Sequence, residues 1–274
     1  WDAAADSATT QVVVGLPAGV FCATVSDANN CTSSICVTLT EPSTAVDVTA
    51  TVTSDFNGSA IQCFGDSSGT ALAVATGGAP ALSGYTFSWS LTSQTTALAT
   101  GLPDGTFVVT AIDSVGCQDT AIVTLIDPSQ VVASTVVVNT VSCLGGCDGE
   151  ATVSAVGGVA GYTVLWDAAA GNQTTATATG LCQGLYGVTI SDANGCSSAS
   201  TVNITQPSTA VTASALVSSN YNGQDISCNN AFDGVACGSA VGGTPSYTYL
   251  WGGGVASGAT TQCVSGLNAG TYSV

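Results

Sequence analysis

The sequence predicts an all-β protein: a tandem array of small immunoglobulin-like antiparallel β-sandwich domains, stapled by disulfides. One block of sequence recurs with a period of 79–86 residues, which is too long for a solenoid coil and is typical of a small folded domain. Short runs such as 107–112 and 151–156 alternate with a period of two, and Gly-Gly, Asn-Gly or Asp-Gly pairs punctuate the chain every 8–12 residues. No segment shows a 3.6-residue period, so we expect almost no helix.

The recurring block places the same residue types at nearly constant spacings. A cysteine precedes a Gly-Gly pair by 14 residues, and Tyr-Thr-x-x-Trp, Gly-Leu and Gly-x-aromatic motifs follow. An aspartate then precedes a second cysteine by 4 residues, and a proline comes 11 residues after that cysteine. Trp1 lies in the middle of one block and Val274 in the middle of another. We therefore expect the chain to be part of a longer array of repeats.

Prolines close successive blocks, because proline removes a strand hydrogen-bond donor and restricts the residue before it. Pro42, Pro128 and Pro207 therefore mark the junctions. We expect the second half of a repeat, two complete repeats and the first part of a fourth. The predicted ranges are 1–44, 45–130, 131–209 and 210–274. Each complete repeat, over 45–128 and 131–207, should hold about seven strands.

The composition excludes several classes of function. The 274 residues include no Lys, Arg or His, against 17 acidic residues, and the formal net charge is −17. Nucleic-acid binding needs cations to neutralise phosphate, and Ser-His-Asp catalysis and histidine-ligated zinc need His. The charge repels an anionic membrane surface, and no stretch approaches 18 uninterrupted apolar residues. We therefore expect no enzyme, no nucleic-acid partner and no membrane insertion.

Aromatic residues recur once per repeat and indicate a core. The tryptophan of each Tyr-Thr-x-x-Trp motif should lie under the opposite sheet, beside the aromatic residue of Gly-x-aromatic. An aromatic stripe lining a ligand cleft is the alternative. The tryptophans concerned are Trp89, Trp166 and Trp251.

Twelve cysteines at recurring positions indicate disulfides and an oxidising, extracellular compartment. We expect the two repeated cysteines to pair within a repeat, while the remaining cysteines pair within single repeats. Cys31 and Cys228 are then left over, because their partners lie outside the chain. The predicted pairs are Cys22–Cys36, Cys63–Cys117, Cys143–Cys196, Cys147–Cys182 and Cys237–Cys263.

Acidic and amide side chains in the two longer junctions are candidates for calcium, which prefers oxygen ligands. These are Asp55 and Asn57 in one junction, and Asn222 and Asp225 in the other. Asn-Gly is also a turn former, so Asx turns are the alternative and the favoured interpretation. We expect the repeated aspartates Asp27, Asp113 and Asp192 to cap the turn before each cysteine.

The motifs Cys-x5-Gly-x-Ala, Gly-Gly, Tyr-Thr-x-x-Trp, Gly-Leu-x-x-Gly-x-Tyr, Ser-Asp-Ala-Asn-Gly-Cys and Thr-Gln-Pro closely resemble the SprB-type repeat. That repeat occurs in giant surface adhesins of gliding Bacteroidota that are exported by the type IX system. The resemblance implies an extracellular filament at the cell surface for adhesion, gliding or prey capture. Ser7, Ser114 and Thr120 also match the short Asp-Ser/Thr-apolar pattern of O-glycosylation in Bacteroidota.

Two functions remain open. The repeats form the structural shaft of an adhesive filament, or they are themselves glycan- or cell-binding modules. The loops consist mostly of Ala, Gly, Ser and Thr rather than exposed aromatics, which favours the shaft. A surface with few long charged side chains favours lateral homo-oligomers along the shaft, and other cells or surfaces would be bound by regions outside this chain. No cofactor is expected, apart from the calcium already considered.

Overall fold

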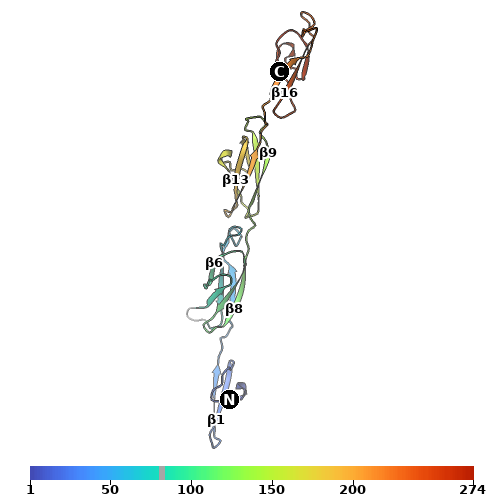
Figure 1. The fold of residues 1–274 in the computed structure, drawn as a ribbon. Helices are drawn as coiled ribbons and strands as arrows, with labels where there is room; N and C mark the ends of the chain where they lie inside the picture. The colour runs from blue at the N-terminus through green and yellow to red at the C-terminus, as the bar shows by residue number, and fades with distance from the viewer. Residues whose placement is uncertain (80–83) are drawn as a thin grey trace. The chain divides into compact units, whose positions relative to one another are not determined.

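The computed structural model describes residues 1–79 and 84–274, and the chain is all-β, as predicted (Figure 1). The helical turns among the described residues are three-residue 3-10 turns, at Ala3–Ala5, Ala168–Ala170 and Gly254–Ala256. The chain divides into two compact units, Trp1–Pro128 and Ser129–Val274. Each unit is described by itself.

The first complete repeat is a sandwich of two three-stranded antiparallel sheets. Its sheets have the strand orders β3-β4-β6 and β5-β7-β8. Apolar residues from both sheets form one core cluster. The strands are β3 (Asp47–Val52), β4 (Gly69–Thr76), β5 (Thr86–Trp89), β6 (Leu98–Leu102), β7 (Gly105–Ile112) and β8 (Gln118–Leu125).

The second complete repeat has the same topology, with sheets β12-β10-β9 and β11-β13-β14. The described part of each complete repeat holds six strands, where about seven were expected. The segment between the first two strands forms turns around the cysteine instead of a strand. The strands are β9 (Val132–Asn139), β10 (Gly149–Val156), β11 (Thr163–Trp166), β12 (Thr177–Leu181), β13 (Gly184–Ser191) and β14 (Ser197–Ile204).

The two ends of the chain hold parts of the same pattern. The hairpin near the N-terminus corresponds to the last two strands of a complete repeat, and the C-terminal sheet corresponds to strands of the first sheet. These strands are β1 (Gly19–Ser26), β2 (Thr32–Leu39), β15 (Thr212–Val217), β16 (Gly234–Val241) and β17 (Cys263–Leu267).

The repeated tryptophans are core residues, as predicted. Trp89, Trp166 and Trp251 are 2%, 0% and 2% exposed. Each indole N–H donates to a threonine carbonyl, at 2.9, 3.0 and 2.9 Å respectively, so the one polar atom of the buried ring has a partner. The aromatic residues of Gly-x-aromatic in the complete repeats, Phe107 and Tyr186, are buried in the same cores.

The second glycine of the Gly-Gly pair lies where a side chain has no room. Gly158 has φ +64°, and a Cβ there would lie 2.5 Å from Asp192 Oδ2 and 2.5 Å from Val131 Cγ2. Its N–H donates to the carbonyl of Ser129 at 2.7 Å. Gly195 also has positive φ, +83°, but a Cβ there would meet nothing within 4 Å.

We predict that Gly158→Ala destabilises the second complete repeat much more than Gly195→Ala. Left-handed backbone costs a non-glycine residue about 1–2 kcal/mol, which both variants incur. Overpacking adds about 1–3 kcal/mol at Gly158 only. Chemical denaturation followed by tryptophan fluorescence measures the difference, and equal losses in the two variants would contradict the close packing described.

Candidate functional site

Each complete repeat has two ends, and the recurring motifs of the sequence meet at these ends. We call the end where the chain enters the first strand the N-pole, and the end where it leaves the last strand the C-pole. The N-pole holds the Gly-Gly turn and the Asp-to-Cys loop, and the C-pole holds the first cysteine of the block.

An aspartate organises the N-pole of the first complete repeat. Asp113 is buried and accepts backbone N–H bonds from Ala79 at 2.9 Å, Val115 at 3.0 Å and Cys117 at 2.8 Å. Ala79 follows the Gly-Gly turn, whereas Val115 and Cys117 belong to the β7–β8 hairpin. The carboxylate therefore ties one sheet to the other.

The second complete repeat repeats this arrangement. Asp192 is buried and accepts from Val159 at 2.8 Å, Asn194 at 2.9 Å and Cys196 at 2.9 Å. In the N-terminal hairpin, Asp27 accepts from the N–H groups of Asn29 and Cys31. The predicted capping role of these aspartates is confirmed.

Hydrogen-bond donors lower the pKa of three carboxylates, those of Asp113, Asp119 and Asp148. The Ala79 N–H is the largest cause that lowers the pKa of Asp113 below its ordinary value of 3.8, and burial partly opposes it. The Val48 N–H, which donates at 2.9 Å, lowers the pKa of Asp119. The Ser142 hydroxyl lowers the pKa of Asp148. Backbone N–H groups and one hydroxyl therefore stabilise these charges in a chain without Lys, Arg or His.

The residue before each junction proline organises the C-pole. Asp127 Oδ2 accepts the Gly65 N–H at 2.8 Å, and Gln206 Oε1 accepts the Gly145 N–H at 2.8 Å. Each of these glycines lies two residues after a repeated cysteine, in a turn with φ +79°. Cys63 and Cys143 are therefore held at the C-pole, next to the end of the last strand.

Three predicted disulfides are present in the structure: Cys22–Cys36, Cys147–Cys182 and Cys237–Cys263. The first and third join directly opposed residues of neighbouring strands. Cys63 and Cys196 are also disulfide-bonded, and Cys31 and Cys228 are free, as are Cys117 and Cys143.

The predicted pairs Cys63–Cys117 and Cys143–Cys196 are wrong, because Cys117 and Cys143 are free. The two repeated cysteines lie at opposite ends of one repeat. Cys117 directly precedes β8, and the turn after Cys63 is bonded to Asp127 beyond the other end of that strand. Eight strand residues extend about 27 Å, whereas the two Cα atoms of a disulfide lie within about 7 Å.

The calcium candidates form turns. Asp55 Oδ1 accepts the Gly58 N–H at 2.7 Å, and in the corresponding loop Asn220 Oδ1 accepts the Gly223 N–H at 2.8 Å. Asn57 and Asn222 occupy left-handed positions of these turns. Asp225 takes part through its carbonyl, which accepts the Ser219 hydroxyl at 2.7 Å. The favoured Asx-turn interpretation therefore describes both loops.

The glycosylation candidates Ser7, Ser114 and Thr120 are all exposed. The Ser114 hydroxyl donates to the Ala79 carbonyl at 2.6 Å, and Thr120 lies in β8 opposite Thr110. Their modification stays a prediction.

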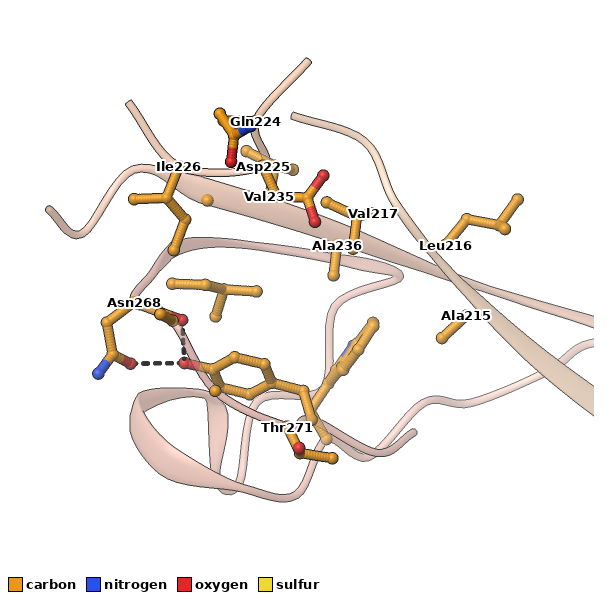
Figure 2. Close-up of a pocket in the computed structure, with 16 residues that line it drawn as sticks. Ala215, Leu216, Val217, Gln224, Asp225, Ile226, Val235, Ala236, Asn268 and Thr271 are labelled. Atoms are coloured by element: carbon orange, nitrogen blue, oxygen red, sulfur yellow. Dashed lines mark hydrogen bonds between the residues drawn. The ribbon is translucent and has the colours of Figure 1, made fainter. Parts of the chain in front are cut away.

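A hollow in the C-terminal part of the chain is lined by residues of the partial repeat, among them Ala236 and Asn268 (Figure 2). Asn268 accepts the Tyr272 hydroxyl through both its carbonyl, at 3.0 Å, and its side-chain oxygen, at 2.6 Å. The lining also includes Trp251 and Leu267.

In the complete repeats the last strand fills the corresponding space. A Cβ at Gly69 would lie 2.2 Å from Leu125 Cδ2, whereas the nearest neighbours of Gly234 are atoms of Leu267 and Ile226. The hollow is thus an open core rather than a constructed ligand site. No group of three Cys, Asp or Glu side chains in residues 1–79 and 84–274 could hold a metal ion.

One repeated contact was not foreseen from the sequence. The tyrosine of each Tyr-Thr-x-x-Trp motif donates its hydroxyl to the first glycine carbonyl of the Gly-Gly pair. Tyr85 does so to Gly77 at 2.6 Å, Tyr162 to Gly157, and Tyr247 to Gly242 at 2.7 Å. The recurrence of a tyrosine 5 to 8 residues after the first glycine of each Gly-Gly pair was the available signal.

We predict that the chain loses stability in acid and that Asp113 contributes to this loss. A lowered folded pKa stabilises the fold above the unfolded value of about 3.9, and this contribution disappears as pH falls through the folded pKa. Asp113→Asn should be less stable at pH 7 and should approach the wild type towards pH 2. Thermal melts from pH 2 to 7 measure this, with exposed Asp104→Asn as the control. A variant that keeps a constant deficit across this range would contradict the prediction.

The SprB repeat model matches residues 135–171, within the second complete repeat. No curated protein matches the chain. Among the matched solved structures are three N-terminal domains of the bacteriophage RB49 highly immunogenic outer capsid protein, Hoc. The identity is 16% and the TM-score 0.37, over 76% of this chain and 74% of that chain.

Two further matches are also repeat or module structures. A tetra-tandem repeat in the extending region of a large adhesion protein is 18% identical with TM-score 0.24, over 83% of this chain and 65% of that one. Fibronectin(III)-like modules of Clostridium thermocellum CbhA are 15% identical with a TM-score of 0.23. The match covers 57% of this chain and 92% of that chain.

No helix among the described residues is both long and apolar enough to cross a bilayer. The recurring motifs and the match at residues 135–171 are consistent with a SprB-type repeat in this part of the chain.

Proposed function

We propose that the chain is the structural shaft of an extracellular, cell-surface adhesive filament, without enzymatic activity. The observation that supports this role most is the route of the chain through each complete repeat. It enters at the N-pole and leaves at the C-pole, so tension on the array passes through the whole length of the sandwich.

The first and last strands of a repeat run side by side in the same direction, so tension shears them past each other. In the first complete repeat the Val48 N–H of β3 donates to Asp119 of β8. In the second, Thr135 of β9 donates to the Thr201 carbonyl of β14 at 2.8 Å. A shear of this kind loads these cross-strand bonds directly, which suits a load-bearing element.

The alternative, that the repeats are glycan- or cell-binding modules, has less support. The repeated tryptophans and the aromatic residues of Gly-x-aromatic in both complete repeats are buried in the cores. The polar groups of the N-pole aspartates are bonded to backbone within their own repeat. A glycan site would need such groups to be available to the ligand.

A replacement experiment separates the two functions. We predict that exchanging residues 45–207 of the full surface protein for unrelated immunoglobulin-like repeats of equal length preserves attachment. Antibodies against residues 45–207 should label intact cells carrying the unexchanged protein. Attachment lost in proportion to the repeats removed would favour binding modules, and label found only after permeabilisation would contradict a surface role.

We also propose lateral association of several copies along the shaft. Apolar residues are exposed on one strand of the second complete repeat, including Val136 (64% exposed) and Val138 (50%). The charge of −17 opposes association, but the Debye length is only about 8 Å at physiological salt.

We predict that a multi-repeat chain forms oligomers whose mass rises with salt. Light scattering from low salt to seawater strength measures this, and Val136→Thr/Val138→Thr should weaken the association. A monomer throughout the salt series would reject lateral packing and leave a single-stranded stalk.

A further inference from the structure

Each complete repeat has two free edge strands on one side of its sandwich. The sheets β3-β4-β6 and β5-β7-β8 have four edge strands, but β3 and β8 lie against each other. In the second complete repeat β9 lies against β14 in the same way. The edges of β6 and β5, and those of β12 and β11, are therefore left without a neighbouring strand in their own repeat. Such an edge presents backbone N–H and C=O groups with which a strand of another chain can pair.

The groups that face outward on β6 follow from its pairing with β4. The carbonyl of Ala97, just before β6, accepts the Ala73 N–H of β4 at 2.9 Å. Successive residues of a strand direct their backbone groups to opposite sides. Leu98 and Thr100 therefore direct theirs away from the sheet, along the free edge.

A glutamine side chain occupies the outward groups of Thr100. Gln94 Oε1 accepts the Thr100 N–H at 2.9 Å, and Gln94 Nε2 donates to the Thr100 carbonyl at 2.8 Å. The Thr96 hydroxyl donates to the Leu98 carbonyl at 2.6 Å. Opposed residues of antiparallel strands exchange the same pair of N–H···O bonds, so the glutamine amide takes the place of a neighbouring strand.

The same glutamine also bonds to the other free edge strand of its repeat. The Gln94 carbonyl accepts the N–H of Trp89, the last residue of β5, at 3.2 Å. That strand is only four residues long, and a short edge offers few groups for pairing. One residue therefore bonds to both free edges of the sandwich.

The second complete repeat has an equivalent glutamine with the same bonds. Gln173 Oε1 accepts the Thr179 N–H at 3.1 Å, and Nε2 donates to the Thr179 carbonyl at 3.0 Å. The Gln173 carbonyl accepts the Trp166 N–H at 2.9 Å. Nε2 also donates to the Ala170 carbonyl at 2.7 Å, so both amide hydrogens of Gln173 are used.

The C-terminal partial repeat has alanine at the equivalent position. The Ala259 carbonyl accepts the Trp251 N–H at 2.9 Å, as the glutamine carbonyls do in the complete repeats. Gln-Thr-Thr at 94–96 and 173–175 is Ala-Thr-Thr at 259–261. Ser265 of β17 corresponds to Thr100 and Thr179, and the methyl group of an alanine cannot bond to it.

We propose that Gln94 and Gln173 protect the free edges of the complete repeats against strand pairing with other copies of the chain. Many proteins protect such edges with charged side chains, above all lysine. This chain has no lysine, and only 6% of its residues are charged, so another device is needed. With the edges occupied, copies can contact one another through side chains without joining into one continuous sheet. The inference rests on bonds within single repeats, and it holds whether or not copies associate laterally as proposed above.

Hydrogen exchange of the full chain, followed by NMR at low salt, tests the proposal. In Gln94→Ala/Gln173→Ala at low protein concentration, the Thr100 and Thr179 amides should exchange about fivefold faster, the factor that one typical hydrogen bond contributes. As the concentration rises, light scattering should detect oligomers and the same two amides should regain protection. A variant that stays monomeric, or oligomers in which these amides remain unprotected, would overturn the proposal.

Two exposed glutamines, one in each complete repeat, provide the matched control. Gln118→Ala/Gln183→Ala removes as many glutamines without touching an edge bond, and it should behave like the wild type. Equal association of the two double variants would show that the lost edge bonds are not the cause and would contradict the proposal.

A variant that removes no bond provides the second test, and it decides the matter if Gln94→Ala/Gln173→Ala exchanges faster throughout its cores because it unfolds. Ala259→Gln introduces the missing side chain beside β17. The Ser265 amide should then exchange about fivefold more slowly at low concentration. Unchanged exchange at Ser265 would show that a glutamine at this position does not occupy the edge, and the proposal would be wrong.

Discussion

The buried N-pole aspartate is the interaction on which the rest of each repeat depends. Asp113 and Asp192 each gather three backbone N–H groups from two segments that are distant in sequence. Because one donor comes from the Gly-Gly turn and the others from the last hairpin, the carboxylate closes the sandwich at one end. It also determines where the second cysteine lies, since the loop that it caps ends at that cysteine.

The absence of basic side chains explains why backbone amides have this role. With no Lys, Arg or His available, a buried carboxylate can be stabilised only by hydrogen-bond donors such as backbone N–H groups. The same solution appears at the C-pole, where Asp127 holds the Gly65 amide and the neutral Gln206 holds Gly145. At the C-pole a side chain that accepts a hydrogen bond is sufficient, whether or not it is charged.

The fold class and the core were predictable because they follow from periodicity. Alternating Val, Thr and Ala runs predict strands, and one tryptophan per repeat predicts a core position, which Trp166 occupies at 0% exposure. The oxidation state of the repeated cysteines, with Cys63 and Cys196 disulfide-bonded and Cys117 and Cys143 free, was not predictable in this way. Spacing along the sequence says how many residues separate two cysteines, but not which end of the sandwich each occupies. The hydrogen bond from each tyrosine hydroxyl to the Gly-Gly turn, such as that from Tyr85 to Gly77, was also not predicted, because spacing along the sequence does not show which groups meet in the fold.

The central claim is that each complete repeat is an independent mechanical unit loaded from pole to pole. Pulling the chemically reduced chain by its two ends in a single-molecule force experiment tests this most directly. The account predicts two separate unfolding steps, one for each complete repeat, each releasing roughly 3.5 Å per unfolded residue. Smooth extension without steps, or one step that releases both repeats together, would contradict it.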